Sequence, residues 1–408
     1  MLDAVLNRGE PLDRAQHAAT QGLPSHADRA LSVAIAQETL RHLVDLDTLI
    51  DSVTQQPLAP DVKVKTVIRL ALVQALILKT PPHAVLSTAL PLLSGGPRRL
   101  AHGVLGTLFR GGAALPANPT VPAGMAEGWT SAWGYATVAA ASHALATQPP
   151  LDLTLRDPAT TENWTTALGG TSLMPGHVRV TAPGAITELP GFAEGAWWVQ
   201  DIAASLPARL LGPGQGRNVL DLCAAPGGKS LQLAAAGWNV LALDKSQKRL
   251  ERMRDNVARN RLDIETRAAD ILEWQPEAAV DAILLDAPCS ATGIFRRHPD
   301  VLYRIVEREI SELVALQAAM LDRCSAWVKP GGAMVFSTCS LEPAEGEEQI
   351  ARFVRDHADW RLDALPAMPL PAGLSTDPRG YLRVLPGQIA DPGGCDGFFM
   401  ARLVRAPH

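Results

Sequence analysis

Two cysteines of this 408-residue chain occupy the same kind of position, 50 residues apart. Cys289 lies in a polar turn that begins at Asp286, directly after an apolar run at residues 280–285. Cys339 follows a second apolar run at residues 333–336. Short apolar runs of this kind predict buried strands, and ligands of open α/β sheets bind just outside the carboxyl ends of strands. We therefore expect the two thiols to face one pocket.

The setting of these two cysteines favours a thiolate nucleophile. A cysteine in an apolar chain is more often a small core residue, and we assign that role to Cys324. No Cys-x-x-Cys pair or nearby pair of histidines accompanies Cys289 and Cys339, so we expect no metal site. The five cysteines are odd in number and scattered, which argues against a disulfide framework and favours a reducing compartment.

A loop of small residues, Cys223-Ala224-Ala225-Pro226-Gly227-Gly228-Lys229, separates a predicted strand from a predicted helix. It lets a ligand approach the backbone closely, but it matches neither the dinucleotide fingerprint nor a complete phosphate-binding loop. Asp244 and Asp270 follow the next two predicted strands. Such acids often only cap a helix. Here Asp244 suits the hydroxyls of a ribose and Asp270 an exocyclic amine, as in an adenosine carrying a cationic sulfonium.

Strands and helices alternate from residue 217 onward. The strands are expected at residues 218–222, 239–243, 264–268, 280–285 and 333–336. This alternation predicts an α/β fold, a parallel sheet with helices on both faces. Residues 381–385 and 398–404 are also strand-like and are expected to pair antiparallel at the edge of the sheet.

The chain before residue 206 predicts two further parts. Residues 1–125 form a helical bundle and its linker, with Ser25 and Asp61 as helix caps. Residues 126–205 predict a helix at 129–146 and then a small α+β element. The expected elements of that part are strands at 151–155, 177–181 and 185–189, with Pro183 between the last two, and a helix at 160–168. Residues 206–408 form the third predicted domain.

The composition limits the partners of the chain. Its formal net charge is −5, which argues against binding nucleic acid by bulk positive charge but leaves room for local basic patches. One such patch is expected on the helix at 246–260 and its ends, with Lys245, Lys248, Arg249, Arg252, Arg254, Arg259 and Arg261. Residues 1–9 do not resemble a signal peptide, and no apolar run is long enough to span a membrane, so we expect a cytoplasmic protein.

Three motifs resemble those of RsmB-type RNA (cytosine-5)-methyltransferases. They are the run at residues 221–229, Asp286-Ala287-Pro288-Cys289-Ser290 and Ser337-Thr338-Cys339-Ser340. The segments Trp198-Val199-Gln200-Asp201, Arg296-Arg297-His298-Pro299-Asp300 and Asp396-Gly397-Phe398-Phe399 also fit. The N-terminal bundle is similar to a NusB-like domain. The resemblance implies a class I S-adenosylmethionine-dependent methyltransferase, Rossmann-like with a mostly parallel sheet, preceded by an all-α NusB-like bundle and a small α+β element.

The resemblance also implies a catalytic role for four residues. Cys339 would add to C6 of cytosine, which makes C5 able to accept a methyl group. Cys289 would help to remove the C5 proton and release the product. Asp286 would hold the N3 and N4 edge of the base, and Lys229 would lie near the base or the carboxylate of the cofactor.

The resemblance implies S-adenosylmethionine as cofactor and ribosomal RNA, of the small subunit, as substrate of a monomer. The cofactor residues would be Cys223, Ala224, Ala225, Pro226, Gly227, Gly228, Lys229, Asp244, Arg249, Asp270 and Asp286. RNA contacts would come from Arg296, Arg297 and Gln200. Two other readings stay open: a methyltransferase with a substrate other than RNA, and a catalytically inert RNA-binding protein of ribosome assembly. The first has no need of two strand-end cysteines, and the intact pair also argues against the second.

Overall fold

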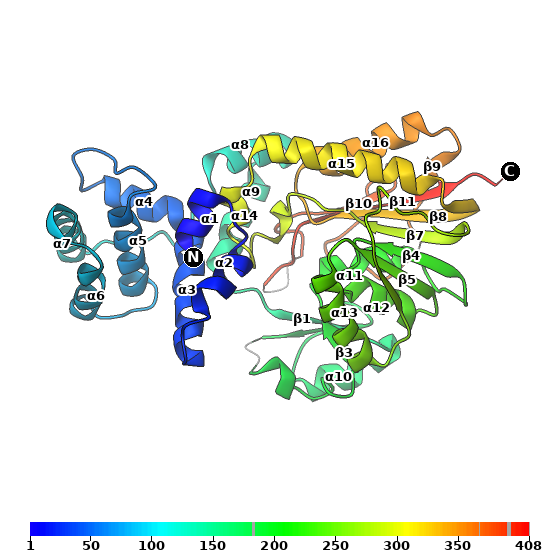
Figure 1. Ribbon diagram of the computed structural model, residues 1–408, viewed down its shortest axis with the longest axis horizontal. Coiled ribbons are helices and arrows are strands. Elements are labelled where there is room, and N and C mark those ends of the chain that lie inside the picture. The colour runs from blue at the N-terminus through cyan, green and yellow to red at the C-terminus, as the bar shows by residue number, and fades with distance from the viewer. Residues whose placement is uncertain (182–183, 367, 390–392, 408) are drawn as a thin grey trace. The chain divides into compact units, whose positions relative to one another are not determined.

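The structure is a computed structural model, and it describes residues 1–181, 184–366, 368–389 and 393–407. It divides into two compact units (Figure 1). The first comprises Met1–Gln148 and Phe295–Val306, and the second comprises Pro149–Ile294 and Glu307–His408. Among the described residues, none of the helices combines the length and apolar character needed to cross a membrane.

The first unit is helical. Its helices are α1 (Leu2–Arg8), α2 (Leu12–Thr20), α3 (His26–Arg41), α4 (Leu43–Asp51), α5 (Lys63–Leu76), α6 (Pro82–Ala89), α7 (Gly95–Arg110), α8 (Ala123–Trp133), α9 (Tyr135–Ala146) and α14 (Val301–Arg304). Ser25 caps α3 as predicted, since its side chain accepts a hydrogen bond from the backbone N–H of Asp28. The predicted cap at Asp61 is wrong, because Val62 occupies the cap position of α5.

Helix α5 supplies much of the core of the first unit. Its apolar residues recur at spacings of three and four, which puts them on one face of the helix. Ile68 and Leu72 are fully buried there and belong to one apolar cluster with Leu46 of α4 and Leu105 of α7. The predicted helical bundle is therefore present.

Residues 295–306 are part of this unit although they follow the Cys289 loop in the sequence. The ring of Phe295 packs on Trp129 of α8, with ring centroids 5.6 Å apart. Asp300 Oδ2 accepts a hydrogen bond from the backbone N–H of Leu12 at 3.2 Å. Nη2 of Arg41 donates to the carbonyl of Arg296 at 2.6 Å. These contacts fix the segment within the helical unit.

A small antiparallel sheet begins the second unit. Its strands are β1 (Leu151–Leu155), β2 (His177–Val180) and β3 (Trp197–Val199), in the order β2-β1-β3, and α10 (Thr161–Ala167) lies in the connection from β1 to β2. Asp152 and Arg179 form a buried ion pair across β1 and β2 at 2.8 Å. The strand predicted at residues 185–189 is wrong, because a 3-10 turn, Ile186–Glu188, lies there. Pro183 lies outside the described residues.

The main sheet confirms the predicted class. Its strands are β4 (Asn218–Leu222), β5 (Asn239–Asp244), β6 (Glu265–Ala268), β7 (Val280–Asp286), β8 (Val328–Thr338), β9 (Trp360–Leu362), β10 (Tyr381–Val384) and β11 (Phe398–Arg405). They lie in the order β10-β11-β8-β7-β4-β5-β6, and β9 pairs with β11. Strands β4 to β8 are parallel, and β10 and β11 run antiparallel at the edge, as predicted.

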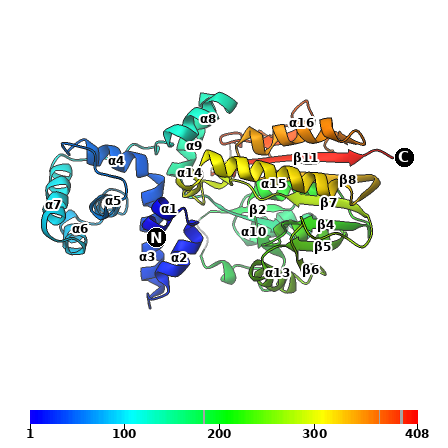
Figure 2. The ribbon, with the colours of Figure 1, turned by 45° about the horizontal axis from the view of Figure 1, so that its top comes forward.

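Helices cover both faces of this sheet (Figure 2). They are α11 (Ile202–Arg209), α12 (Gly228–Ala235) and α13 (Gln247–Asn260) on one face, and α15 (Glu307–Ser325) and α16 (Glu347–Asp356) on the other. Side chains alternate along a strand, so Ala282 and Leu284 of β7 pack toward the first group of helices. Ile283 and Leu285 pack toward the second. Every loop that follows a parallel strand therefore emerges at one edge between two helical layers.

Candidate active site

The register of the parallel strands brings the predicted loops together. Leu222 at the end of β4 pairs with Leu285 of β7, so Cys223 and Asp286 come next on neighbouring strands. Asp286 in turn pairs with Ser337 of β8, two residues before Cys339. The small-residue loop and both cysteine loops therefore leave the sheet side by side, as the sequence predicts.

Cys289 and Cys339 lie in direct contact, with their Sγ atoms 3.5 Å apart. The two loops also touch through the backbone, because the N–H of Gly293 donates to the carbonyl of Cys339 at 2.9 Å. A Cβ atom at position 293 would lie 2.2 Å from the carbonyl oxygen of Gly397. Only glycine therefore permits this approach of the backbones. The two thiols therefore lie together, as a shared site requires.

Two cysteines near this edge of the sheet, Cys289 and Cys223, have raised pKa values. The pKa of Cys289 lies well above that of an ordinary thiol, because Cys289 hydrogen-bonds to Cys339, is buried, and faces the negative charges of Cys339 and Glu345. The surroundings thus favour the thiol form of Cys289. Burial also raises the pKa of Cys223 to about 12, so Cys223 stays a thiol at neutral pH. A thiol is a poor nucleophile, which leaves Cys339 as the better candidate for attack.

Asp286 is held between two partners. Its Oδ2 accepts from Nζ of Lys229 at 2.7 Å, and its Oδ1 accepts from the hydroxyl of Ser337 at 2.8 Å. Burial lowers the pKa of Lys229, but the charge of Asp286 and the hydrogen bond to it outweigh that effect, so the pKa lies above its usual value. Lys229 also lies over the ring of Phe398, 5.1 Å from its centroid. Lys229 is therefore a cation that fixes an anionic Asp286 beside the cysteines.

The small-residue loop packs tightly against α13. Gly227 caps α12 with φ of 103°, and a Cβ atom there would lie 2.7 Å from Cγ of Met253. Asp244, at the end of β5, accepts hydrogen bonds from the N–H groups of Ala225 at 3.2 Å and Ser246 at 2.9 Å. Arg249 of α13 reaches the same loop, since its guanidinium donates to the carbonyl of Ala225. The structure thus brings the expected cofactor residues 223–229, Asp244 and Arg249 together.

Asp270 lies one strand further along the same edge. It follows β6 and binds Nζ of Lys245 at 2.7 Å and the N–H of Leu272 at 2.9 Å. The N–H of Ala269 donates to the carbonyl of Asp244 at 3.1 Å, which ties the two loops together. Asp270 is therefore in the expected place, although its carboxylate already has a lysine partner.

Two of the three residues expected to contact RNA are buried. The side chain of Gln200 is 8% exposed and bonds to Trp198 at 2.8 Å and to Gln232 at 2.9 Å. Arg296 is 1% exposed and lies in the helical unit. The expectation of a direct RNA contact from Gln200 and Arg296 is therefore corrected, because their side chains face the protein interior. Arg297 is partly exposed.

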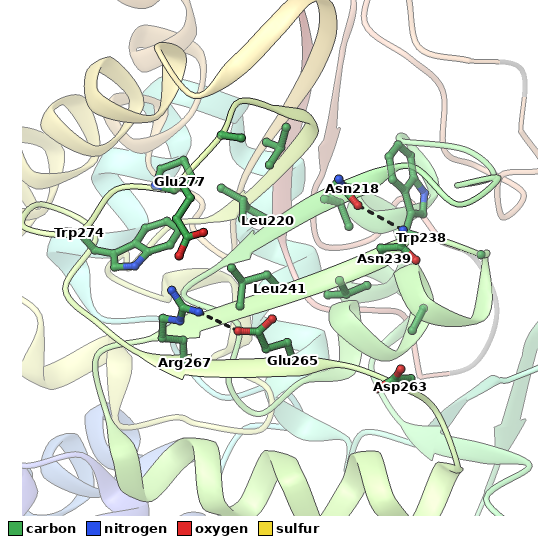
Figure 3. A pocket seen from close by; sticks show the side chains of 17 residues that line it. Asn218, Leu220, Trp238, Asn239, Leu241, Asp263, Glu265, Arg267, Trp274 and Glu277 are labelled. Atoms are coloured by element: carbon green, nitrogen blue, oxygen red, sulfur yellow. Dashed lines mark hydrogen bonds and ion pairs between the residues drawn. The ribbon is translucent and has the colours of Figure 1, made fainter.

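A pocket of about 850 Å³ opens at the other end of the same strands (Figure 3). Asn218 and Asn239, the first residues of β4 and β5, lie on its wall, and Glu265 bonds to Arg267 there at 2.8 Å. Neither Cys289 nor Cys339 is among the 17 lining residues. Because doubly wound sheets bind ligands at the carboxyl ends of their strands, we assign the chemistry to the cysteine loops and not to this pocket.

Two residues of this site, Ser337 and Glu345, were not among the site residues predicted from the sequence. Ser337 holds Asp286, and its signal is its place opposite the last residue of the neighbouring strand. Glu345 bonds to the backbone directly after Cys289. It stands in an acidic run, Glu345-Gly346-Glu347-Glu348, which reads as a solvated surface. Among the described residues, no group of three or more His, Cys, Asp or Glu side chains is placed to hold a metal ion.

Comparisons with known proteins agree with this geometry. The family model described as 16S rRNA methyltransferase RsmB/F matches residues 208–404, and the NusB family model matches residues 1–95. The Ribosomal RNA small subunit methyltransferase B of Klebsiella pneumoniae is 33% identical over 439 aligned positions, which cover 99% of this chain and 96% of that protein. The chain belongs to the RsmB/F family of 16S rRNA methyltransferases. The predicted resemblance and the NusB-like first part are thereby confirmed.

Other similar proteins add detail to this assignment. The protein of the same description from Serratia proteamaculans is 42% identical over 233 residues. That match covers 56% of this chain and about half, 51%, of the Serratia protein. The crystal structure of PH0851 covers 98% of this chain with a TM-score of 0.75 at 22% identity, which shows a shared fold. The fold of PH0851 is thus shared along almost the whole chain.

Proposed function

We propose that this member of the RsmB/F family methylates C5 of a cytosine in small-subunit ribosomal RNA, with Cys339 as nucleophile. The observation that carries the proposal is the contact of two thiols, 3.5 Å apart, beside the ion pair of Asp286 and Lys229. A methyltransferase that acts on a stronger nucleophile needs no thiol, whereas C5 of cytosine becomes nucleophilic only after a thiolate has added to C6. The relatives named above are described as acting on small-subunit ribosomal RNA.

In the first step, Sγ of Cys339 forms a bond to C6, and the electron pair of the C5–C6 double bond moves onto C5. The anionic Asp286 accepts hydrogen bonds from the amino group at C4 and from protonated N3, which favours the electron-poor ring that attack requires. Lys229 and Ser337 hold Asp286 in place for this contact. Both partners are thus positioning residues for Asp286.

In the last step, the C5 proton is removed and the C6–Sγ bond breaks. Attack on C6 has consumed the negative charge of Cys339, which is one cause of the raised pKa of Cys289. Cys289 then loses its proton to solvent and accepts the C5 proton, so that the electron pair restores the double bond and expels Cys339 as a thiolate. The same contact that keeps Cys289 protonated before attack therefore frees it afterwards.

The loop at residues 223–229 would hold S-adenosylmethionine, with Asp244, Arg249, Asp270 and Asp286 around it. The fit rests on the close packing of Gly227 and on the acids at the ends of β5 and β6, which suit an adenosine and a cation rather than a phosphate. S-adenosylmethionine supplies the methyl group, carried on a sulfonium, that C5 takes up. Within this chain, the raised pKa of Cys223 keeps that residue from competing for the methyl group.

The RNA would bind through local basic surfaces. Exposed cations of α13 and its ends are Lys245, Lys248, Arg249, Arg252, Arg254 and Arg261. The NusB-like unit and the partly exposed Arg297 would add contacts, and the target base must leave any stack to reach Cys339. A substrate in the small ribosomal subunit supports a cytoplasmic location for the enzyme.

The test is incubation of the protein with methyl-labelled S-adenosylmethionine and unmodified small-subunit rRNA, followed by nucleoside analysis. We expect label in 5-methylcytidine and none with Cys339→Ala. Label in another nucleoside, or none in RNA, would reject the proposal. RNA binding without any label would support the rival function, an inert assembly protein of the same family.

A further inference from the structure

Glu345 is a fully buried acid next to both cysteine loops. It ends the 3-10 turn Pro343–Glu345, which follows the Cys339 loop, and its side chain is 0% exposed. Its carboxylate accepts hydrogen bonds from the backbone N–H of Ser290 at 2.9 Å and from Nε2 of Gln317 at 3.0 Å, and also from the hydroxyl of Ser290. Burial of a carboxylate is costly unless its oxygens are paired, and here the partners flank Cys289.

Glu345 holds the backbone after Cys289 directly and the backbone before it through Gln317. The N–H after it, that of Ser290, donates to Glu345. The carbonyl before it, that of Pro288, accepts from Gln317 at 2.9 Å, and the same amide of Gln317 donates to Glu345. Cys289 is therefore bracketed by a network with Glu345 at its centre.

The network also reaches the loop of the second cysteine. The hydroxyl of Ser290 lies 3.1 Å from that of Ser340, the residue after Cys339. Thr292 Oγ1 accepts from the N–H of Leu341 at 3.0 Å. One carboxylate thus connects the residues that follow both cysteines.

The Cys339 loop has anchors of its own that do not involve the carboxylate. Thr338 pairs with Phe399 in the sheet, and Arg383 donates to the carbonyl of Ser340. Loss of the carboxylate would therefore displace Cys289 more than Cys339. A displacement of about 1 Å at a reacting group lowers rates by about 10²-fold.

We propose that Glu345 is a positioning residue that holds Cys289 against Cys339 and thereby controls the release of methylated RNA from the enzyme. The inference rests on the proposed function, in which Cys339 attacks and Cys289 completes the reaction. It assigns to a residue outside the cysteine motifs the geometry on which the second step depends.

The test compares Glu345→Gln with Glu348→Gln, which removes the same charge from an exposed position three residues away. Glutamine keeps the shape of the side chain but cannot accept the bonds of Ser290 and Gln317 at both oxygens. We expect Glu345→Gln to raise the ratio of covalent protein–RNA adduct to released 5-methylcytidine at least fivefold. Glu348→Gln should give the wild-type ratio. Ser290→Ala removes only a hydroxyl, and we expect it to raise the ratio in the same direction.

A merely structural role would lower adduct and product together, in proportion to the folded fraction, and would leave their ratio unchanged. An unchanged ratio in Glu345→Gln overturns the inference. If Glu345→Gln does not fold, an unchanged ratio in Ser290→Ala overturns it. Absence of label from wild-type reactions is a different result, because it rejects the proposed function itself.

Discussion

Cys289 and Cys339 share a hydrogen bond of 3.5 Å between their Sγ atoms, across loops that follow the adjacent strands β7 and β8. The hydrogen bond to Cys339 and burial raise the pKa of Cys289 well above that of an ordinary thiol, which favours its protonated form. This difference supports the proposed roles, in which Cys339 attacks and Cys289 acts once the charge of Cys339 has been consumed.

Replacement of Asp286 by asparagine tests the ion pair with Lys229. The variant keeps the shape but loses the charge that faces the base, and we expect kcat to fall by about 10²-fold or more, as for other groups that stabilise charge in a transition state. Asp281→Asn is the matched control, since Asp281 lies on the same strand and binds Lys329. Equal kcat values for the two variants would argue against a role for Asp286 in the reaction.

Replacement of Gly227 by alanine tests the cofactor loop. The added Cβ would lie 2.7 Å from Met253, and the backbone has φ of 103°. We expect the Kd for S-adenosylmethionine, measured by calorimetry, to rise at least tenfold, about 1.4 kcal/mol. Gly212→Ala is the control, because Gly212 also has positive φ, 66°, but has open space around it. A similar loss in both variants would mean that backbone strain, and not the fit of the loop, is responsible.

Arg296 and Arg297 should behave differently although they are adjacent. Arg296 is buried in the helical unit, so Arg296→Ala should lower the free energy of unfolding by about 1–3 kcal/mol. Arg297 is partly exposed. Its replacement should reduce the slope of log K against log salt for RNA binding by about 1. A stable Arg296→Ala with a weakened RNA affinity would restore the original expectation for that residue.

Asp221 makes the stability of the second unit depend on pH. Burial raises its pKa to about 7, whereas an unfolded aspartate has a pKa of about 3.9. As pH rises, Asp221 therefore loses its proton in the unfolded chain before it does so in the folded chain. Its contribution to the free energy of unfolding accordingly falls between about pH 4 and about pH 7. In denaturant titrations, we expect the difference in the free energy of unfolding between Asp221→Asn and the wild type to shift by about 2–3 kcal/mol in favour of the variant between pH 5 and pH 8. An equal difference at both pH values would contradict this.

Much of the fold could be predicted because strand and helix alternate with strong apolar runs. Residues 280–285 and 333–336 could be placed as neighbouring strands, and from this followed the approach of Cys289 and Cys339. The strands β3 and β9 were not predicted, because a strand of three residues is too short to show a recognisable alternation of apolar and polar side chains. The strand expected at 185–189 was wrong because its apolar and polar residues also suit a 3-10 turn.

The burial of polar side chains could not be predicted from residue type. Arg296 is basic, and Glu345 stands in an acidic run, so both read as surface residues. Both are buried because residues far away in the sequence pack around them. Ser290, for example, hydrogen-bonds to Glu345 although 55 positions separate the two residues. Such pairing depends on tertiary contacts, which local spacing does not encode.

The central claim is that Cys339 attacks the base and Cys289 completes the reaction. Mass spectrometry of digested reactions with rRNA and S-adenosylmethionine tests it most directly. In Cys289→Ala we expect a nucleotide covalently attached to the peptide that contains Cys339, and in Cys339→Ala neither adduct nor 5-methylcytidine. An adduct on Cys289 in the Cys339→Ala variant would contradict the assignment and reverse the two roles.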